Sequence, residues 1–140
     1  MAGLLTPQQR GHAMADELRR WARSPFDLAT DNCGLSVLGY AETISGRRLP
    51  RGRGIAGARA AARLTADRDA FARVAAALMA RLGWRETATP APGDVGLVEN
   101  GGQMVAAICV IMSSGEPIWA MRAGHGVVMQ RAPMLRAWRL

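Results

Sequence analysis

The sequence predicts an α+β protein in which N-terminal helices pack on a C-terminal antiparallel sheet. Up to about Gly83 the apolar residues recur at helical spacing, and beyond it short apolar runs are separated by turn residues. Helices that precede the strands, and do not alternate with them, are typical of the α+β class. The 140 residues suit a single domain, with a helical part of about residues 1–83 and a sheet part of about residues 84–140.

Two helices are predicted in the first third of the chain. The run Thr6-Pro7-Gln8-Gln9 offers a capping hydroxyl, a proline in the first turn and a glutamine that can reach back, so a helix should begin there. It should end at Ser24-Pro25, because proline restricts the residue before it. A second helix is predicted from residue 32 or 33 to Ile44. Its apolar residues cover much of its circumference, so we expect it to be buried.

Two further helices are predicted before the sheet. A basic, glycine-rich loop over residues 47–54 should lead into a short alanine-rich helix over about residues 55–64. Thr65 is then expected to cap a longer helix that stops at Gly83.

Strands are predicted for the rest of the chain. Residues 84–87 form either a short strand or a linker, and Pro90 and Pro92 then interrupt regular structure. The expected strands cover residues 95–99, 103–112, 117–122, 126–130 and 135–139.

The composition is that of a folded protein, and its choice of basic residues is unusual. Hydrophobic residues make up 49% of the chain and charged residues 21%, which is enough for a packed core. The net charge is +7, and all 18 basic residues are arginine. Arginine without lysine, beside abundant alanine and glycine, fits the coding bias of a GC-rich genome. The arginines are scattered and aromatic residues are few, which argues against nucleic acid as the partner. Binding of DNA or a teichoic-type polyanion stays a weaker alternative.

Several protein classes are not expected from this sequence. No apolar run approaches the ~20 residues that cross a bilayer, and no secretory signal is visible, so we expect no membrane span. The two cysteines, Cys33 and Cys109, are too few for a disulfide scaffold or a four-thiolate zinc site. Neither cysteine has a histidine at a spacing that suggests a metal site, so we expect no metal. Neither a phosphate loop nor a dinucleotide fingerprint is present, and we expect no cofactor.

Cys33 is the candidate nucleophile. It lies in the first turn of a predicted helix, where the helix dipole and free N–H groups favour a thiolate. Catalysis would also need a base, normally histidine. His12 lies in the first helix, and His125 lies in a glycine-flanked turn; both positions are more typical of surface residues, and His125 is the candidate base. The alternative is that Cys33 simply packs as a small apolar residue.

Cys109 introduces a second alternative. On a strand it should share a face with Val105 and Ala107, so it could point toward the helix that carries Cys33. A disulfide or a resolving thiol would then be conceivable. Two isolated core cysteines are the simpler interpretation, because nothing in the sequence marks an oxidising compartment.

Several short motifs occur in an order that resembles the NlpC/P60 family of cysteine peptidases. The closest resemblance is to the small DUF6950-type proteins found in tail gene clusters of phages and gene transfer agents. The order extends from Pro25 to the end of the chain. The motifs are Pro25-Phe26, Asp31-x-Cys33, Pro92-Gly93-Asp94-Val95, the apolar strand at residues 105–109, and Ala137-Trp138-Arg139.

The resemblance implies a papain-like α+β fold and a place for each catalytic group. Cys33 matches the nucleophile. The base is expected at Met104 or Val105, and neither side chain can accept a proton. The orienting residue is expected within residues 117–120, which contain no His, Asn or Gln. General acid–base help is worth ~10²–10⁴-fold in rate, so the resemblance does not carry the activity with it.

Two functions are therefore expected. The first is a structural component of a phage-type tail tip or baseplate with little or no peptidase activity. Such a protein would be made in the bacterial cytoplasm, reside in the virion and contact other tail proteins. The alternative is an active peptidoglycan endopeptidase that uses Cys33 with a non-standard base, either His125 or a group from a partner chain, on bacterial cell-wall peptides.

Overall fold

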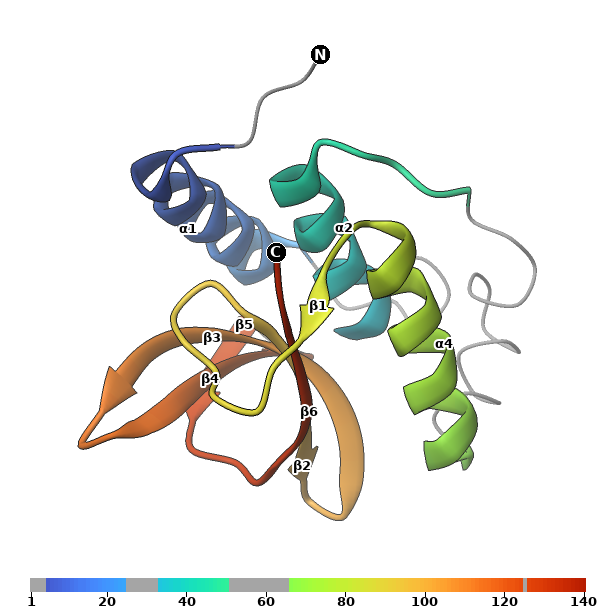
Figure 1. The fold of residues 1–140 in the computed structure, drawn as a ribbon. Helices are drawn as coiled ribbons and strands as arrows, with labels where there is room; N and C mark the ends of the chain where they lie inside the picture. The colour runs from blue at the N-terminus through green and yellow to red at the C-terminus, as the bar shows by residue number, and fades with distance from the viewer. Residues whose placement is uncertain (1–4, 25–32, 51–65, 125) are drawn as a thin grey trace.

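The computed structural model describes residues 5–24, 33–50, 66–124 and 126–140, and for Cys33 it describes the backbone only. It confirms the predicted α+β class. Helices α1 (Pro7–Arg23), α2 (Cys33–Ser45) and α4 (Arg68–Arg81) precede the strands. The predicted helix at residues 55–64 and the predicted cap at Thr65 lie outside the described residues. Figure 1 shows the three helices on the same side of the sheet.

The local signals explain where two of these helices begin. The Thr6 hydroxyl accepts from the N–H of Gln9 at 3.1 Å, and the Gln9 side chain accepts from the N–H of Thr6 at 2.8 Å. This is the predicted capping box. Helix α4 begins at Arg68, later than predicted, because the Asp67 carboxylate accepts from the N–H of Ala70 at 3.0 Å and caps the helix there.

The sheet has six antiparallel strands in the order β1-β6-β2-β3-β4-β5. The last strand of the chain therefore lies between the first two. Strand bounds agree with the prediction to within two residues. The strands are β1 (Arg85–Glu86), β2 (Val95–Asn100), β3 (Gln103–Ser113), β4 (Glu116–Ala123), β5 (Gly126–Gln130) and β6 (Met134–Arg139).

The two faces of the sheet are buried in different ways. One face packs against the helices, and this core contains α2 side chains such as Tyr40 together with Ile108 and Trp138. The other face forms a second apolar cluster around Trp119, which is fully buried although no described helix contributes to that cluster. Figure 1 shows strongly curved strands, and a Cβ on Gly96 would lie 2.5 Å from the Trp119 ring. The curvature lets the sheet bury its second face against itself.

The connection between β1 and β2 is fixed to the sheet at its end. The N–H of Gly93 donates to the carbonyl of Cys109 at 2.7 Å, and the N–H of Cys109 donates to the carbonyl of Asp94 at 2.8 Å. The Tyr40 hydroxyl donates to the Gly93 carbonyl at 2.8 Å. Residues 93 and 94 are thus held between α2 and β3. None of the helices in the described ranges has the length and apolarity needed to cross a membrane.

Candidate functional site

Cys33 is the first residue of α2, as predicted. By the 3.6-residue repeat, position 33 lies on the same stripe of the helix as Val37, Tyr40 and Ile44. These three side chains are buried in the core between the helices and the sheet. The first turn of α2 contains no acidic residue, so the dipole at this helix start is not opposed by a carboxylate from that turn.

The two positions where a base was expected lie on opposite faces of β3. Met104 packs against the core shared with the helices, as do Ala106 and Ile108 on the same face. Val105 packs against the second cluster, on the face directed away from the helices. Helix α2 itself packs against β3. Met104 therefore occupies the only one of the two positions that faces the helix layer, and a thioether is not a base.

The position of an orienting residue is equally apolar. Residues 117–120 lie on β4, where Trp119 pairs with Cys109 and Ala120 pairs with Ile108. Both side chains are fully buried. Residues 117–120 therefore offer no His, Asn or Gln side chain that could orient an imidazole beside β3.

His125 lies outside the described residues, but both of its flanks are placed. The guanidinium of Arg122, at the end of β4, donates to the Ser24 carbonyl at 2.7 Å. A Cβ on Gly126 would lie 4.0 Å from Cα of Ala22. The β4–β5 hairpin is thus fixed to the end of α1, just before the chain continues to Cys33. The other histidine, His12, is exposed on α1.

The interpretation of Cys109 that pointed its thiol toward the helix of Cys33 is wrong. Cys109 does share a face with Ala107 and Val105, but that face belongs to the second cluster, away from α2. The strand alternation places Ile108, and not Cys109, against the helices. Burial, and next the nearby Asp94 carboxylate, raise the pKa of Cys109 to about 11. Cys109 is a neutral, free thiol, buried in the second cluster.

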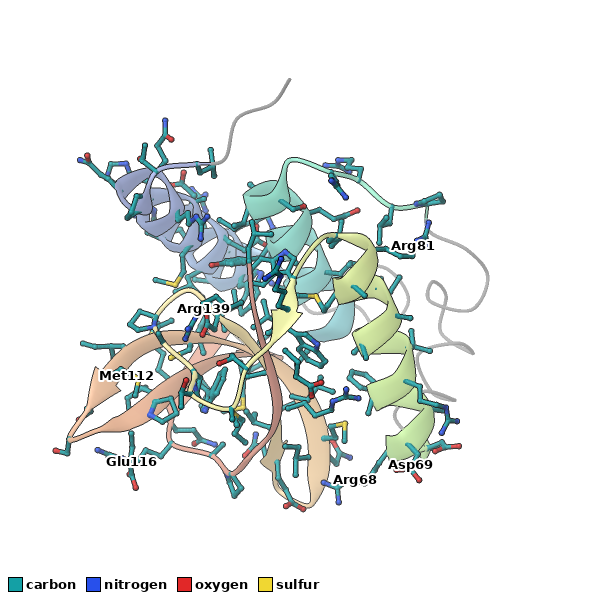
Figure 2. All side chains as sticks on the ribbon, in the orientation of Figure 1. Arg68, Asp69, Arg81, Met112, Glu116 and Arg139 are labelled. Carbon is teal, nitrogen blue, oxygen red and sulfur yellow. The ribbon has the colours of Figure 1, made fainter. Side chains whose placement is uncertain are left out.

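A cavity that the sequence did not reveal lies at the other half of α2. It has a volume of about 300 Å³ and is lined by residues of α1, α2, the connection before β2 and the end of the chain, among them Arg10, Tyr40, Trp84 and Arg139. Figure 2 shows Arg139 between α1 and the sheet. These residues are far apart in the sequence, so no spacing rule could have grouped them.

The charges at this cavity are organised around Asp94. Its carboxylate is almost fully buried and accepts from the Arg139 guanidinium at 2.8 Å and from the N–H of Ala91 at 2.8 Å. Burial, and then the Asp94 charge, raise the pKa of Tyr40 far above its ordinary value, although Arg10 lowers it. The phenol is therefore neutral near neutral pH. Within the described part of the chain, no group of three or more His, Cys, Asp or Glu residues could hold a metal ion.

A comparison with protein families identifies one match. The model of a domain of unknown function, DUF6950, matches residues 8–140. The chain therefore belongs to the DUF6950 family, as the order of its motifs suggested. No curated protein and no solved structure matches the chain.

Proposed function

We propose that this member of the DUF6950 family is a structural component of a phage-type tail tip or baseplate, built on a peptidase-like core that lacks its general base. The observation that carries the proposal is the place of Met104. It lies on the face of β3 that packs against the helix layer, where the NlpC/P60 resemblance calls for an imidazole. The relation to NlpC/P60 enzymes and to phage tails is part of this proposal.

The chemistry of a cysteine peptidase explains why Met104 matters. The thiol must lose a proton before it attacks, and the leaving amine must gain one. An imidazole does both, whereas the Met104 thioether and the Val105 isopropyl group do neither. The start of α2 can lower the pKa of a thiol, but it cannot protonate a leaving group. We therefore expect hydrolysis to be lower by the ~10²–10⁴-fold that general acid–base catalysis supplies, or to be undetectable.

Exposed apolar side chains on the outer strands support a role in protein contacts. Ile111 is 56% exposed and Met129 is 53% exposed. Ile111 pairs with Ile118, and Met129 pairs with Ala120, so these side chains share one face of β3, β4 and β5. Exposed apolar groups that gather on one surface mark protein contacts.

The location can be tested in a bacterium that encodes the chain and assembles tail particles. A tagged chain should co-sediment with purified particles after lysis. Ile111→Glu should reduce its incorporation, whereas Ala88→Glu, which adds the same charge on an exposed loop away from the outer strands, should not. A tagged chain that stays entirely in the particle-free fraction would contradict the structural role.

The absence of hydrolysis can be tested on purified peptidoglycan stem peptides. Wild-type protein and Cys33→Ser should give the same background rate of peptide release, measured by mass spectrometry. Cleavage by the wild type that disappears in Cys33→Ser would contradict the proposal and favour the alternative function.

That alternative is an active peptidoglycan endopeptidase in which Cys33 works with His125. One observation favours it: Arg122 and Gly126 fix the hairpin that carries His125 to the end of α1, from which the chain leads to Cys33. In this case both Cys33→Ser and His125→Ala would abolish cleavage. The control His12→Ala, at an exposed position of α1, would not. If a partner chain supplied the base, only Cys33→Ser would abolish it.

A further inference from the structure

The cavity beside Tyr40 is separate from the candidate peptidase site. Tyr40 lies about two helical turns along α2 from Cys33, and Met104 is not among the described residues that line the cavity. Its volume of about 300 Å³ is at the lower end of the ~300–1,000 Å³ typical of small-ligand sites. The cavity therefore plays no part in the function proposed above.

A glycine in α1 keeps the cavity open. Gly11 lines it, and a Cβ built on Gly11 would meet no atom within 4 Å. Glycine inside a helix is less favourable than alanine by ~0.5–1 kcal/mol, so the position is not optimised for helix stability. Its neighbours Arg10 and Met14 also line the cavity. A large side chain at position 11 would occupy the empty space.

The walls are apolar, and a guanidinium group that forms no ion pair with the described residues lies at one side. Met14, Ile44 and Trp84 contribute apolar surface. The Asp94 carboxylate is already matched by Arg139. The Arg10 guanidinium donates from Nε to the Leu5 carbonyl at 3.3 Å and forms no ion pair within the described residues. The cavity thus has one cation whose charge is not neutralised.

One residue of the wall, Trp84, also has a polar atom without a partner within the described ranges. Trp84 is only 4% exposed, and its indole N–H has no hydrogen-bond partner among the described residues. Buried donors of this kind are rare, because each costs free energy unless an acceptor is supplied. Tyr40 lies beside Trp84, with ring centroids 6.3 Å apart. Positive charge beside apolar walls is complementary to a negatively charged acceptor that is attached to an apolar body.

We propose that this cavity binds a small carboxylate with an aromatic or bulky aliphatic body, with the carboxylate at Arg10 and the body against Met14 and Trp84. The same chemistry is presented by a free aromatic acid and by the C-terminal residue of a peptide. The two sources differ only in what extends from the ligand out of the cavity.

A matched set of probes tests the chemistry on the full chain. N-acetylphenylalanine carries the carboxylate and the ring, its amide removes the charge, and N-acetylglycine removes the ring. Binding is followed by the NMR signals of the tryptophan indole N–H groups. The acid should bind, the amide about tenfold more weakly and N-acetylglycine not at all, because a charge-assisted hydrogen bond is lost in the amide. A peptide that ends in phenylalanine should bind more tightly than the free acid if the natural ligand is a protein terminus, and less tightly if it is a small molecule.

Variants of α1 test the location. Arg10→Gln should weaken binding of the acid about tenfold without weakening that of the amide. Gly11→Leu should abolish both. The controls are Arg19→Gln and His12→Leu, at exposed α1 positions that do not line the cavity; both should bind as the wild type does. Equal affinity for acid and amide, unchanged binding by Gly11→Leu, or no binding of any probe at millimolar concentration would overturn the proposal.

Discussion

Arg139 and Asp94 form an ion pair that joins the end of β6 to the connection before β2. The Arg139 Nη2 lies 2.8 Å from Oδ2 of Asp94, and Nε lies 3.2 Å from Oδ1. The Asp94 side chain is only 6% exposed, whereas that of Arg139 is 45% exposed. The buried carboxylate therefore depends on the arginine and on the N–H of Ala91 for compensation.

Removing this carboxylate should destabilise the fold. Asp94→Ala deprives Arg139 and the N–H of Ala91 of their acceptor, and we expect the free energy of unfolding to fall by about 1–3 kcal/mol. The loss is limited because Arg139 can be hydrated when unpaired. Chemical denaturation measures the change. Glu116→Gln breaks an exposed pair with Arg131 and should cost less than about 1 kcal/mol. Equal losses in the two variants would contradict the importance of Asp94.

The close approach of Gly96 to Trp119 predicts a second loss of stability. A Cβ at position 96 would lie 2.5 Å from the Trp119 ring, which is fully buried and cannot move away freely. Gly96→Ala should therefore lower the free energy of unfolding by about 1–3 kcal/mol or more. Gly11→Ala, where the new Cβ meets open space in a helix, should instead raise it by about 0.5–1 kcal/mol. Thermal denaturation of both variants distinguishes these signs, and a stable Gly96→Ala would refute the packing of the second cluster.

The raised pKa of Cys109 predicts that its thiol is inert. Because burial raises this pKa to about 11, the native thiol stays protonated near neutral pH. In the Cys33→Ser variant, a thiol reagent should not react with the native protein and should react with one thiol after unfolding. Rapid modification of native Cys33→Ser would show that Cys109 is accessible and ionised, contrary to this account.

The raised pKa of Cys109 also predicts how the free energy of unfolding changes with pH. The unfolded chain loses the Cys109 proton at a lower pH than the folded protein does, because the folded pKa is raised to about 11. The contribution of the buried, protonated Cys109 thiol to the free energy of unfolding is thus fully present below the ordinary thiol pKa. It is lost as the pH rises toward 11. Cys109→Ala should show a shallower decline over that range in denaturation measured at several pH values. Parallel curves would argue against the burial of this thiol.

Local sequence signals predicted the helices and strands well, but they could not predict how these elements pack against one another. The Thr6–Gln9 capping box and the strand at residues 126–130 agree with the prediction because their determinants are neighbours in sequence. The sequence could not decide which face Cys109 occupies, because alternation groups residues by face but does not say which face meets a helix. That choice depends on which of two apolar clusters the helices cover.

At the candidate site, too, some features could be predicted from the sequence and others depend on packing. The start of α2 at Cys33 could be predicted from the sequence, and so could the apolar character of Met104 and Val105. The sequence could not show which of these two side chains faces the helices, because that depends on the packing of β3. The contact of Asp94 with Arg139 and the cavity beside Tyr40 bring together residues from both ends of the chain. No periodic pattern links such residues.

We propose that a missing imidazole at position 104 separates this chain from a working peptidase. This claim is tested most directly by Met104→His, with Val105→His as the matched control on the opposite face of β3. We expect release of stem peptides from peptidoglycan by Met104→His, none by Val105→His, and none by the Met104→His, Cys33→Ser double variant. Cleavage by the wild type that matches that of Met104→His, or equal gains in the two histidine variants, would contradict the claim.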